Sequence, residues 1–305
     1  MLEDRKLFLN GDLISWKEAQ VHLMSHSFAR GSAIFEVLGF HEVDSRPAVF
    51  RLDQHIERLL KSAQHLDMEL PYSGKELHDA VLETVKQNSV MQGMIKIICY
   101  YSRIVFEVLP PKDKLDVAIF VVVPSEDVGG IGFSFEQGTT ACVSKWRKLD
   151  PETVPVEAKV AANYLNGMVA RQEAKKRGFE YPIMLDTQGF IAEGPTESLF
   201  LVKDGKLLVP ALGTVLQSIS RKSILEVAAY TGIEFSEQRL AADLLYEADE
   251  MFFSATAYKV LPVRKVEDRE VPSAPGPVSR KLYEVMNDII TGKNDHFKEW
   301  LFAVK

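Results

Sequence analysis

The 305-residue sequence has only two cysteines and no long apolar run. Cys99 and Cys142 lie far apart among apolar residues, so a disulfide framework has little support and we expect two buried thiols. No segment reaches the roughly 20 apolar residues that a membrane span requires. The start, Met1-Leu2-Glu3-Asp4, lacks the basic and apolar regions of a secretory signal. We therefore expect no membrane contact and a cytoplasmic location.

The sequence also lacks an excess of basic residues, because its formal net charge is −7. This balance argues against a general nucleic-acid surface, which needs a concentrated basic stripe. Its seven histidines show no metal-ligand spacing, so we expect no metal site. A G-x-S-x-G elbow, a Walker loop and a G-x-G-x-x-G after a strand are all missing. Hydrolases, P-loop kinases and Rossmann dehydrogenases thereby lose their usual support.

The length of the chain favours two domains, since single hydrophobic cores stop growing at roughly 250 to 300 residues. Hydrophobic residues make up 46% and charged residues 26%, which is ordinary for a soluble globular protein. Pro124 to Gly130 is the best candidate linker, because polar and glycine residues interrupt the apolar periodicity there. We predict a small domain over 1–124, a loop over 125–131 and a larger domain over 132–305.

Strands and helices alternate irregularly, which predicts an α/β (α+β) protein. In the first domain we predict a short strand within 6–12 that runs into an Asn10-Gly11 turn, and strands at 48–52, 94–101 and 117–123. Asp53 is predicted to cap a helix whose apolar face carries Ile56, Leu59, Leu60, Ala63 and Leu66. Ser73 begins a second helix with capping-box spacing to Glu76. In the second domain we predict strands at 140–144, 181–186, 190–193, 198–202, 206–209 and 250–255, and helices at 161–176 and 220–230.

Lys159 is the most informative candidate for chemistry. It follows Val154-Pro155-Val156-Glu157-Ala158 at a junction of loop and helix, among small and apolar residues. Desolvation there would lower the pKa of the amine and keep it nucleophilic, as Schiff-base chemistry requires. On composition alone, a surface lysine near a helix start is the more frequent interpretation.

Three further groups could hold a charged cofactor. Ser218 to Ser223 places hydroxyls and free backbone N–H groups at a helix start, which favours a phosphate, although a simple serine cap is more common. Ser254-Ala255-Thr256-Ala257 follows an apolar strand and could add donors to the same anion. Glu193 ends another apolar strand, where a carboxylate could pair with a pyridine nitrogen or simply face solvent. Arg58 would usually be a solvated or ion-paired arginine.

Together these motifs resemble the class IV aminotransferases, the fold-type IV enzymes that depend on pyridoxal 5'-phosphate (PLP). The resemblance runs from Met24-Ser25-His26 through 50–59 to 276–281. It implies the two-domain D-amino acid aminotransferase-like fold, with PLP in the cleft between domains. The branched-chain pattern is nearest, through Val154 to Lys159 and Glu193 to Phe200. Leu216 to Ser223 is equally similar to the (R)-amine transaminases.

The resemblance also implies roles for these residues. Lys159 would form the Schiff base and move the proton between the substrate α-carbon and the cofactor. Tyr164 would hydrogen-bond the phenolate oxygen of PLP, and Glu193 would hold its ring nitrogen protonated. The phosphate would be bound by Arg58, Ile219, Ser220 and Thr256.

The substrate pocket departs from the branched-chain pattern. Arg30 stands where that pattern has tyrosine, Gly39 follows Phe35-Glu36 where it has arginine, and Lys96 replaces the arginine of a Tyr-Ile-Arg motif. Arg30 could clamp a carboxylate or be a surface arginine. Candidate substrate contacts are Arg30, Phe35, Gly39, Lys96, Ala257 and the Val128 to Gly132 loop.

The sequence thus predicts transamination from a hydrophobic, branched-chain type amino acid to 2-oxoglutarate or a related oxo acid. Activity on D-amino acids or (R)-amines, or elimination of the aminodeoxychorismate lyase type, remain alternatives. A small-molecule binding protein on the same fold is the non-enzymatic alternative. The family also implies a homodimer or a larger homo-oligomer.

Overall fold

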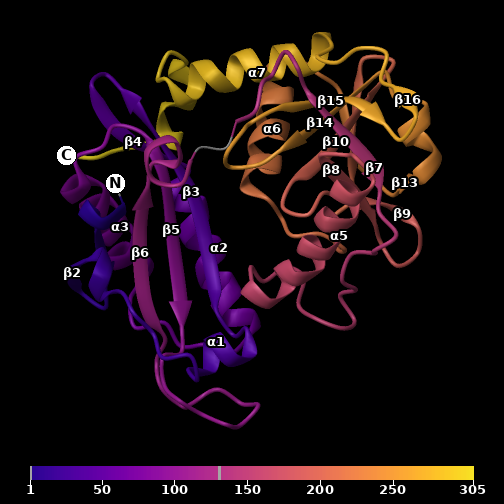
Figure 1. The fold of residues 1–305 in the computed structure, drawn as a ribbon. Helices are drawn as coiled ribbons and strands as arrows, with labels where there is room; N and C mark the ends of the chain where they lie inside the picture. The colour runs from indigo at the N-terminus through magenta and orange to yellow at the C-terminus, as the bar shows by residue number, and fades with distance from the viewer. Residues whose placement is uncertain (1, 130–131) are drawn as a thin grey trace. The chain divides into compact units, whose positions relative to one another are not determined.

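The computed structural model describes residues 2–129 and 132–305, which divide into two units (Figure 1). The first contains 2–129 together with Ala158–Ala162 and Asp288–Lys305. The second contains Gly132–Glu157 and Asn163–Asn287. Two late stretches of the chain therefore belong to the first unit, a return that no local sequence pattern had indicated.

The first unit is built on a seven-stranded antiparallel sheet in the order β17-β4-β3-β5-β6-β1-β2. Its strands alternate between a buried and a more exposed face, as in β5, where Ile95, Ile97 and Cys99 are buried. The bounds are β1 (Lys6–Leu9), β2 (Asp12–Ser15), β3 (Ile34–Val43), β4 (Arg46–Phe50), β5 (Gly93–Tyr100), β6 (Asp116–Val122) and β17 (Leu301–Ala303).

Two helices, α2 (Leu52–His65) and α3 (Gly74–Asn88), pack on the buried face of this sheet and form one core with it. Ile56, Leu59 and Ala63 are buried in that core, as the helical spacing predicts. Leu60 is 36% exposed, so its predicted place on the same face was wrong. The shorter helices are α1 (His26–Arg30) and α4 (Pro124–Asp127), with 3₁₀ turns at Leu2–Asp4, Trp16–Glu18 and Asp295–Trp300.

The start of α2 corrects another prediction. Arg51, not Asp53, is the N-cap, with φ 54° and ψ 38°, so the predicted strand at 48–52 ends at Phe50. The guanidinium of Arg51 lies 4.1 Å from the ring centroid of Trp300, a long-range contact that sequence spacing could not indicate. Asp53 lies in the first turn instead, where a carboxylate favours the helix dipole.

Other local signals hold with small shifts. The Ser73–Glu76 capping box is present at the start of α3. The predicted Asn-Gly turn is confirmed, because Asn10 and Gly11 both have positive φ and turn β1, which ends at Leu9, into β2. The predicted linker contains α4, because Pro124 can begin a helix.

The second unit contains a ten-stranded mixed sheet in the order β12-β11-β10-β14-β15-β7-β8-β9-β13, with β16 paired to β15. Its core includes Ile183, Leu199, Met251 and Phe253. The strands are β7 (Thr139–Val143), β8 (Tyr181–Leu185), β9 (Phe190–Glu193), β10 (Ser198–Lys203), β11 (Lys206–Pro210), β12 (Phe235–Gln238), β13 (Leu240–Ala241), β14 (Glu250–Ser254), β15 (Leu261–Val266) and β16 (Arg269–Glu270). The helices are α5 (Tyr164–Lys176), α6 (Ile219–Tyr230) and α7 (Pro277–Ile290), with 3₁₀ turns at Ala161–Asn163 and Ala242–Tyr246.

The predicted helices at 161–176 and 220–230 largely match the structure, with the first turn of the former in 3₁₀ form. The predicted strands of this region are confirmed to within two residues at each end. Across 2–129 and 132–305, no helix is long and apolar enough to cross a membrane.

The packing of α2 gives a direct test. Leu59→Ala should lower the free energy of unfolding by about 2 to 5 kcal/mol, because it leaves a cavity in a fully buried position. Leu60→Ala, one residue away and partly exposed, should cost about 0.5 kcal/mol or less. Urea unfolding followed by circular dichroism measures both, and equal losses would contradict the assigned helix face.

Candidate active site

Lys159 is fixed at its backbone by two elements of the first unit. Its N–H donates to Ser62 Oγ of α2 at 3.0 Å, and its carbonyl accepts from the N–H of Phe35 in β3 at 3.1 Å. Ala158 and Val160 on either side are buried in the core, whereas Lys159 itself is half-buried. The ammonium lies 5.0 Å from the centre of the Phe35 ring. The backbone of the segment is thus anchored on both sides of the Lys159 side chain.

Arg58 lies on α2 and forms a two-point ion pair with Glu36 of β3. Its Nε and Nη2 donate to the two oxygens of Glu36, both at 2.7 Å. His55, one turn earlier, shares Oε2 of the same carboxylate at 2.7 Å. The Glu36 side chain has no exposed surface. Such two-point pairs fix the plane of a guanidinium, so Arg58 has one preferred orientation.

The pKa values in this cluster follow from burial and charge. Burial alone would raise the pKa of Glu36, but the Arg58 charge and the hydrogen bonds from Arg58 and His55 hold it at about 2. Burial lowers the pKa of His55 to about 4, against the attraction of Glu36. At neutral pH Glu36 is therefore ionised, and neutral His55 donates through Nδ1–H.

Phe35 is flanked by a second cation. Lys96 of β5 is exposed, pairs in register with Val37, and places its ammonium 5.3 Å from the Phe35 ring centre. Gly39 is buried in β3 opposite Met94. The structure thus brings together Lys159, Phe35 and Lys96, three of the residues singled out in the sequence.

Arg30 lies at the end of α1, and its Nη2 donates to the carbonyl of Phe106 at 2.9 Å. The guanidinium therefore supports the loop after β5. In the predicted loop from Val128 to Gly132, residues 130 and 131 lie outside the described residues, and Val128 is exposed.

Glu193 belongs to the second unit, at the end of β9. It is buried, and its Oε1 lies 2.7 Å from Nζ of Lys148. The backbone N–H of Lys148 donates to Leu185, so this lysine is tied to β8 beside β9. Tyr164 is half-buried at the first position of α5. A buried carboxylate at the end of a strand suits a partner for a protonated ring nitrogen.

Donors for an anion also belong to this unit. Ile219 and Ser220 form the first turn of α6, whose N-cap Ser218 accepts from the N–H of Arg221. The first N–H groups of a helix have no partner within the helix and attract anions. Thr256 and Ala257 lie in a turn closed by the N–H of Ala255 donating to Tyr258.

Beside that turn, the hydroxyl of Ser254 is buried and has no hydrogen-bond partner among the described residues. A buried hydroxyl without a partner fits a site that completes its hydrogen bonds with a bound polar group. The donor set of the second unit therefore fits a phosphate-bearing cofactor.

Several functional candidates were missed in the sequence. Glu36 had a usable signal, a single acid inside the apolar run Ile34 to Phe40. Lys148 and Ser62 had none, because their roles depend on contacts between distant segments. Lys259 was also missed; its Nζ lies 3.3 Å from the Thr256 carbonyl, and burial lowers its pKa to about 8. Within the described ranges, no group of three or more metal-binding side chains occurs.

The predicted site residues thus form two sets on different units. Lys159, Arg58, Phe35 and Lys96 belong to the first, and Tyr164, Glu193, Ile219, Ser220, Thr256 and Ala257 to the second. Their meeting at one cofactor stays a prediction.

Comparison with known proteins identifies the family of the chain. The model of the class IV amino-transferase family matches residues 33–266. The branched-chain-amino-acid aminotransferase of Escherichia coli K12 is 33% identical over 98% of this chain and 97% of its own. That of Pseudomonas aeruginosa is 31% identical over 99% and 98%.

Solved structures of similar proteins cover the chain equally well. The branched-chain aminotransferase from Thermoproteus uzoniensis with norvaline matches with a TM-score of 0.92 and 32% identity over 99% of both chains. The branched-chain amino acid aminotransferase from Thermobaculum terrenum in its PLP form matches with a TM-score of 0.92 and 26% identity over 100% of both. The resemblance predicted from the motifs is confirmed, and the chain belongs to the class IV aminotransferase family.

Proposed function

We propose that this protein is a PLP-dependent transaminase that moves the amino group of a hydrophobic, branched-chain type amino acid to 2-oxoglutarate or a related oxo acid. The observation that carries the proposal is the anchored backbone of the half-buried Lys159, whose ammonium lies beside Phe35. The non-enzymatic alternative, a binding protein on the same fold, has no need of a Schiff-base lysine. The branched-chain names of the similar enzymes support the donor class.

PLP supplies an aldehyde that takes up the amino group and a ring that accepts electron density from the substrate α-carbon. Lys159 would hold the aldehyde and move the proton at the substrate α-carbon. Tyr164 would donate to the phenolate oxygen, and Glu193, paired with Lys148, would hold the ring nitrogen protonated. The residues proposed to hold the phosphate are Arg58 of the first unit and, in the second, the first turn of α6 and Thr256.

The proposed substrate contacts suit a hydrophobic amino donor. Phe35 and Val37 present apolar surface on the exposed face of β3, and Lys96 adds one cation beside them. Apolar surface suits a branched side chain, and a cation suits the carboxylate of an amino or oxo acid. Arg30, Gly39 and Ala257 complete the proposed set.

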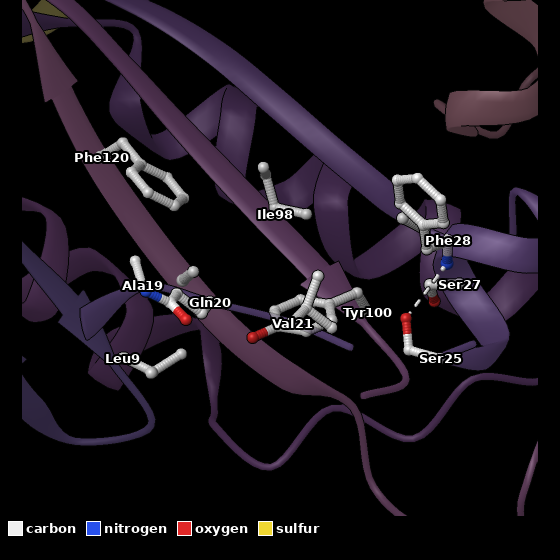
Figure 2. Close-up of a pocket in the computed structure, with 12 residues that line it drawn as sticks. Leu9, Ala19, Gln20, Val21, Ser25, Ser27, Phe28, Ile98, Tyr100 and Phe120 are labelled. Carbon is white, nitrogen blue, oxygen red and sulfur yellow. Dashed lines mark hydrogen bonds between the residues drawn. The ribbon is translucent and has the colours of Figure 1, made fainter. Parts of the chain in front are cut away.

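We also propose a cytoplasmic homodimer. A pocket of about 270 Å³ opens on the sheet of the first unit, lined by Ile98, Tyr100 and Phe120, with Phe28 beside it (Figure 2). The neighbouring loop exposes Phe106 by 79% and Val108 by 78%. Two free, buried cysteines fit a reducing compartment.

The loop that carries Phe106 and Val108 is held by contacts at its backbone carbonyls. The Phe106 carbonyl accepts from Arg30, and the Val108 carbonyl lies 3.1 Å from Nε2 of His26. Apolar surface of this kind is seldom left open on a monomer. A second copy of the chain is the occupant that the family implies.

Lys159→Ala should lower transamination by at least about 10²-fold, because no other group replaces the proton transfer. Lys176→Ala, an exposed lysine at the end of α5, is the control and should keep full activity. Activity is followed as 2-oxoglutarate-dependent loss of L-leucine, with circular dichroism to confirm folding. Unchanged turnover by the Lys159 variant would refute its role.

A donor scan decides between the alternative substrates. We expect turnover with L-leucine, L-isoleucine and L-valine and none with D-alanine or an (R)-amine. Product analysis by chromatography also detects elimination. Activity confined to D-alanine or (R)-amines would replace the branched-chain proposal.

The dimer is tested by sedimentation velocity at micromolar concentration. The wild type should sediment as a dimer, and Phe106→Asp with Val108→Asp should shift it toward monomer, because two charges would be buried without partners. Tyr230→Asp, half exposed on α6, is the control for an added surface charge. A monomeric wild type would contradict the proposal.

A further inference from the structure

One face of α2 touches both ends of the proposed cofactor site. Arg58, assigned to the phosphate, is bound by Glu36, and Ser62 accepts the N–H of Lys159, assigned to the aldehyde. Residues four apart share a helix face and lie about 6 Å apart along the axis. The helix therefore sets a spacing between the two ends.

Strand β3 contacts the same two residues, Lys159 and Arg58. We call α2 and β3 with these contacts the frame. Phe35 donates its N–H to the carbonyl of Lys159, and the next residue, Glu36, accepts from Arg58. The Lys159 backbone is therefore held from both β3 and α2, and Arg58, itself part of α2, is held from β3 by Glu36.

This frame is rigid. Leu52, Ile56 and Leu59 of α2 pack into the core together with Ile34 and Leu38 of β3. Glu36 and Ser62 are both fully buried. Close-packed interiors transmit displacement rather than absorb it, so a change at either residue moves the group it holds.

We propose that Glu36 and Ser62 are positioning residues that fix the separation between Lys159 and Arg58, so that the protein selects ligands carrying an aldehyde and a phosphate at one distance. The inference rests on the proposed function. A fixed separation adds no affinity for a ligand that carries only an aldehyde or only a phosphate. It raises the affinity for a ligand that carries both, because binding at one end raises the effective concentration at the other.

A charge effect of Glu36 makes the opposite prediction. Its negative charge weakens the attraction of Arg58 for an anion, so a purely electrostatic role means that Glu36→Gln tightens phosphate binding. Glu36→Asp keeps the charge and withdraws the carboxylate. Only a positioning role makes both variants bind PLP more weakly.

The experiment measures dissociation constants of PLP, pyridoxal and inorganic phosphate for the full chain freed of bound cofactor. Absorbance reports the two aldehydes, and calorimetry reports phosphate. Glu36→Gln, Glu36→Asp and Ser62→Ala should each weaken PLP binding about tenfold or more. Affinities for pyridoxal and for phosphate alone should change less than about threefold, because neither ligand depends on the separation.

Two controls match these variants within the same unit. Thr84→Ala removes another buried hydroxyl, which bonds to Ala80 in α3, and Asp127→Asn removes a carboxylate paired with Arg5. Both should keep wild-type PLP affinity. Circular dichroism shows whether each variant is folded, and Ser62→Ala tests the frame without altering any charge.

The possible outcomes separate the two proposals. A wild-type chain that does not bind PLP through Lys159 would refute the proposed function. A wild type that binds PLP, with folded variants that bind it equally well or lose all three ligands alike, would overturn the positioning role alone.

Discussion

Glu36 is a carboxylate without exposed surface in the middle of an apolar strand, and the first unit is arranged to compensate its charge. A buried ion is tolerated only when its partners replace the lost hydration. Here three hydrogen bonds from Arg58 and His55 do so, and both donors lie on one face of α2. The compensation requires α2 to dock at one position along β3. The same docking places Ser62 against the Lys159 segment, so the electrostatic requirement of one residue determines the geometry at another.

Local patterns predicted most of the elements, and the motifs marked the candidate site residues. The α2 face, the Ser73 capping box and the two apolar strands around Ile97 and Ile119 depend on spacing along a few residues. Such spacing can be recognised in the sequence without any tertiary contact. The family motifs likewise marked Lys159 and Glu193, because several separated motifs in one order are specific.

What the sequence did not predict depends on distant contacts. The N-cap of α2 was placed at Asp53 because acids commonly cap helices, but the packing of Arg51 against Trp300 decides the conformation there. Lys148, which carries no motif in the sequence, lies 2.7 Å from Glu193 only because the chain folds. Sequence spacing carries no information on such pairs, and tertiary contacts override local preference when they bury more surface.

The late return of the chain to the first unit has a consequence for synthesis. Strand β17 pairs with β4 through Leu301, Phe302 and Ala303, and the whole second unit is translated between these two strands. Until β17 has been made, β4 is an open sheet edge with unpaired backbone groups, and such edges invite pairing with other strands. Arg51 likewise can make its contact with the Trp300 ring only after residue 300 has been synthesised. The first unit is therefore completed only after the second unit has been synthesised. Throughout that time the nascent chain exposes the unpaired edge of β4, which can pair with other strands.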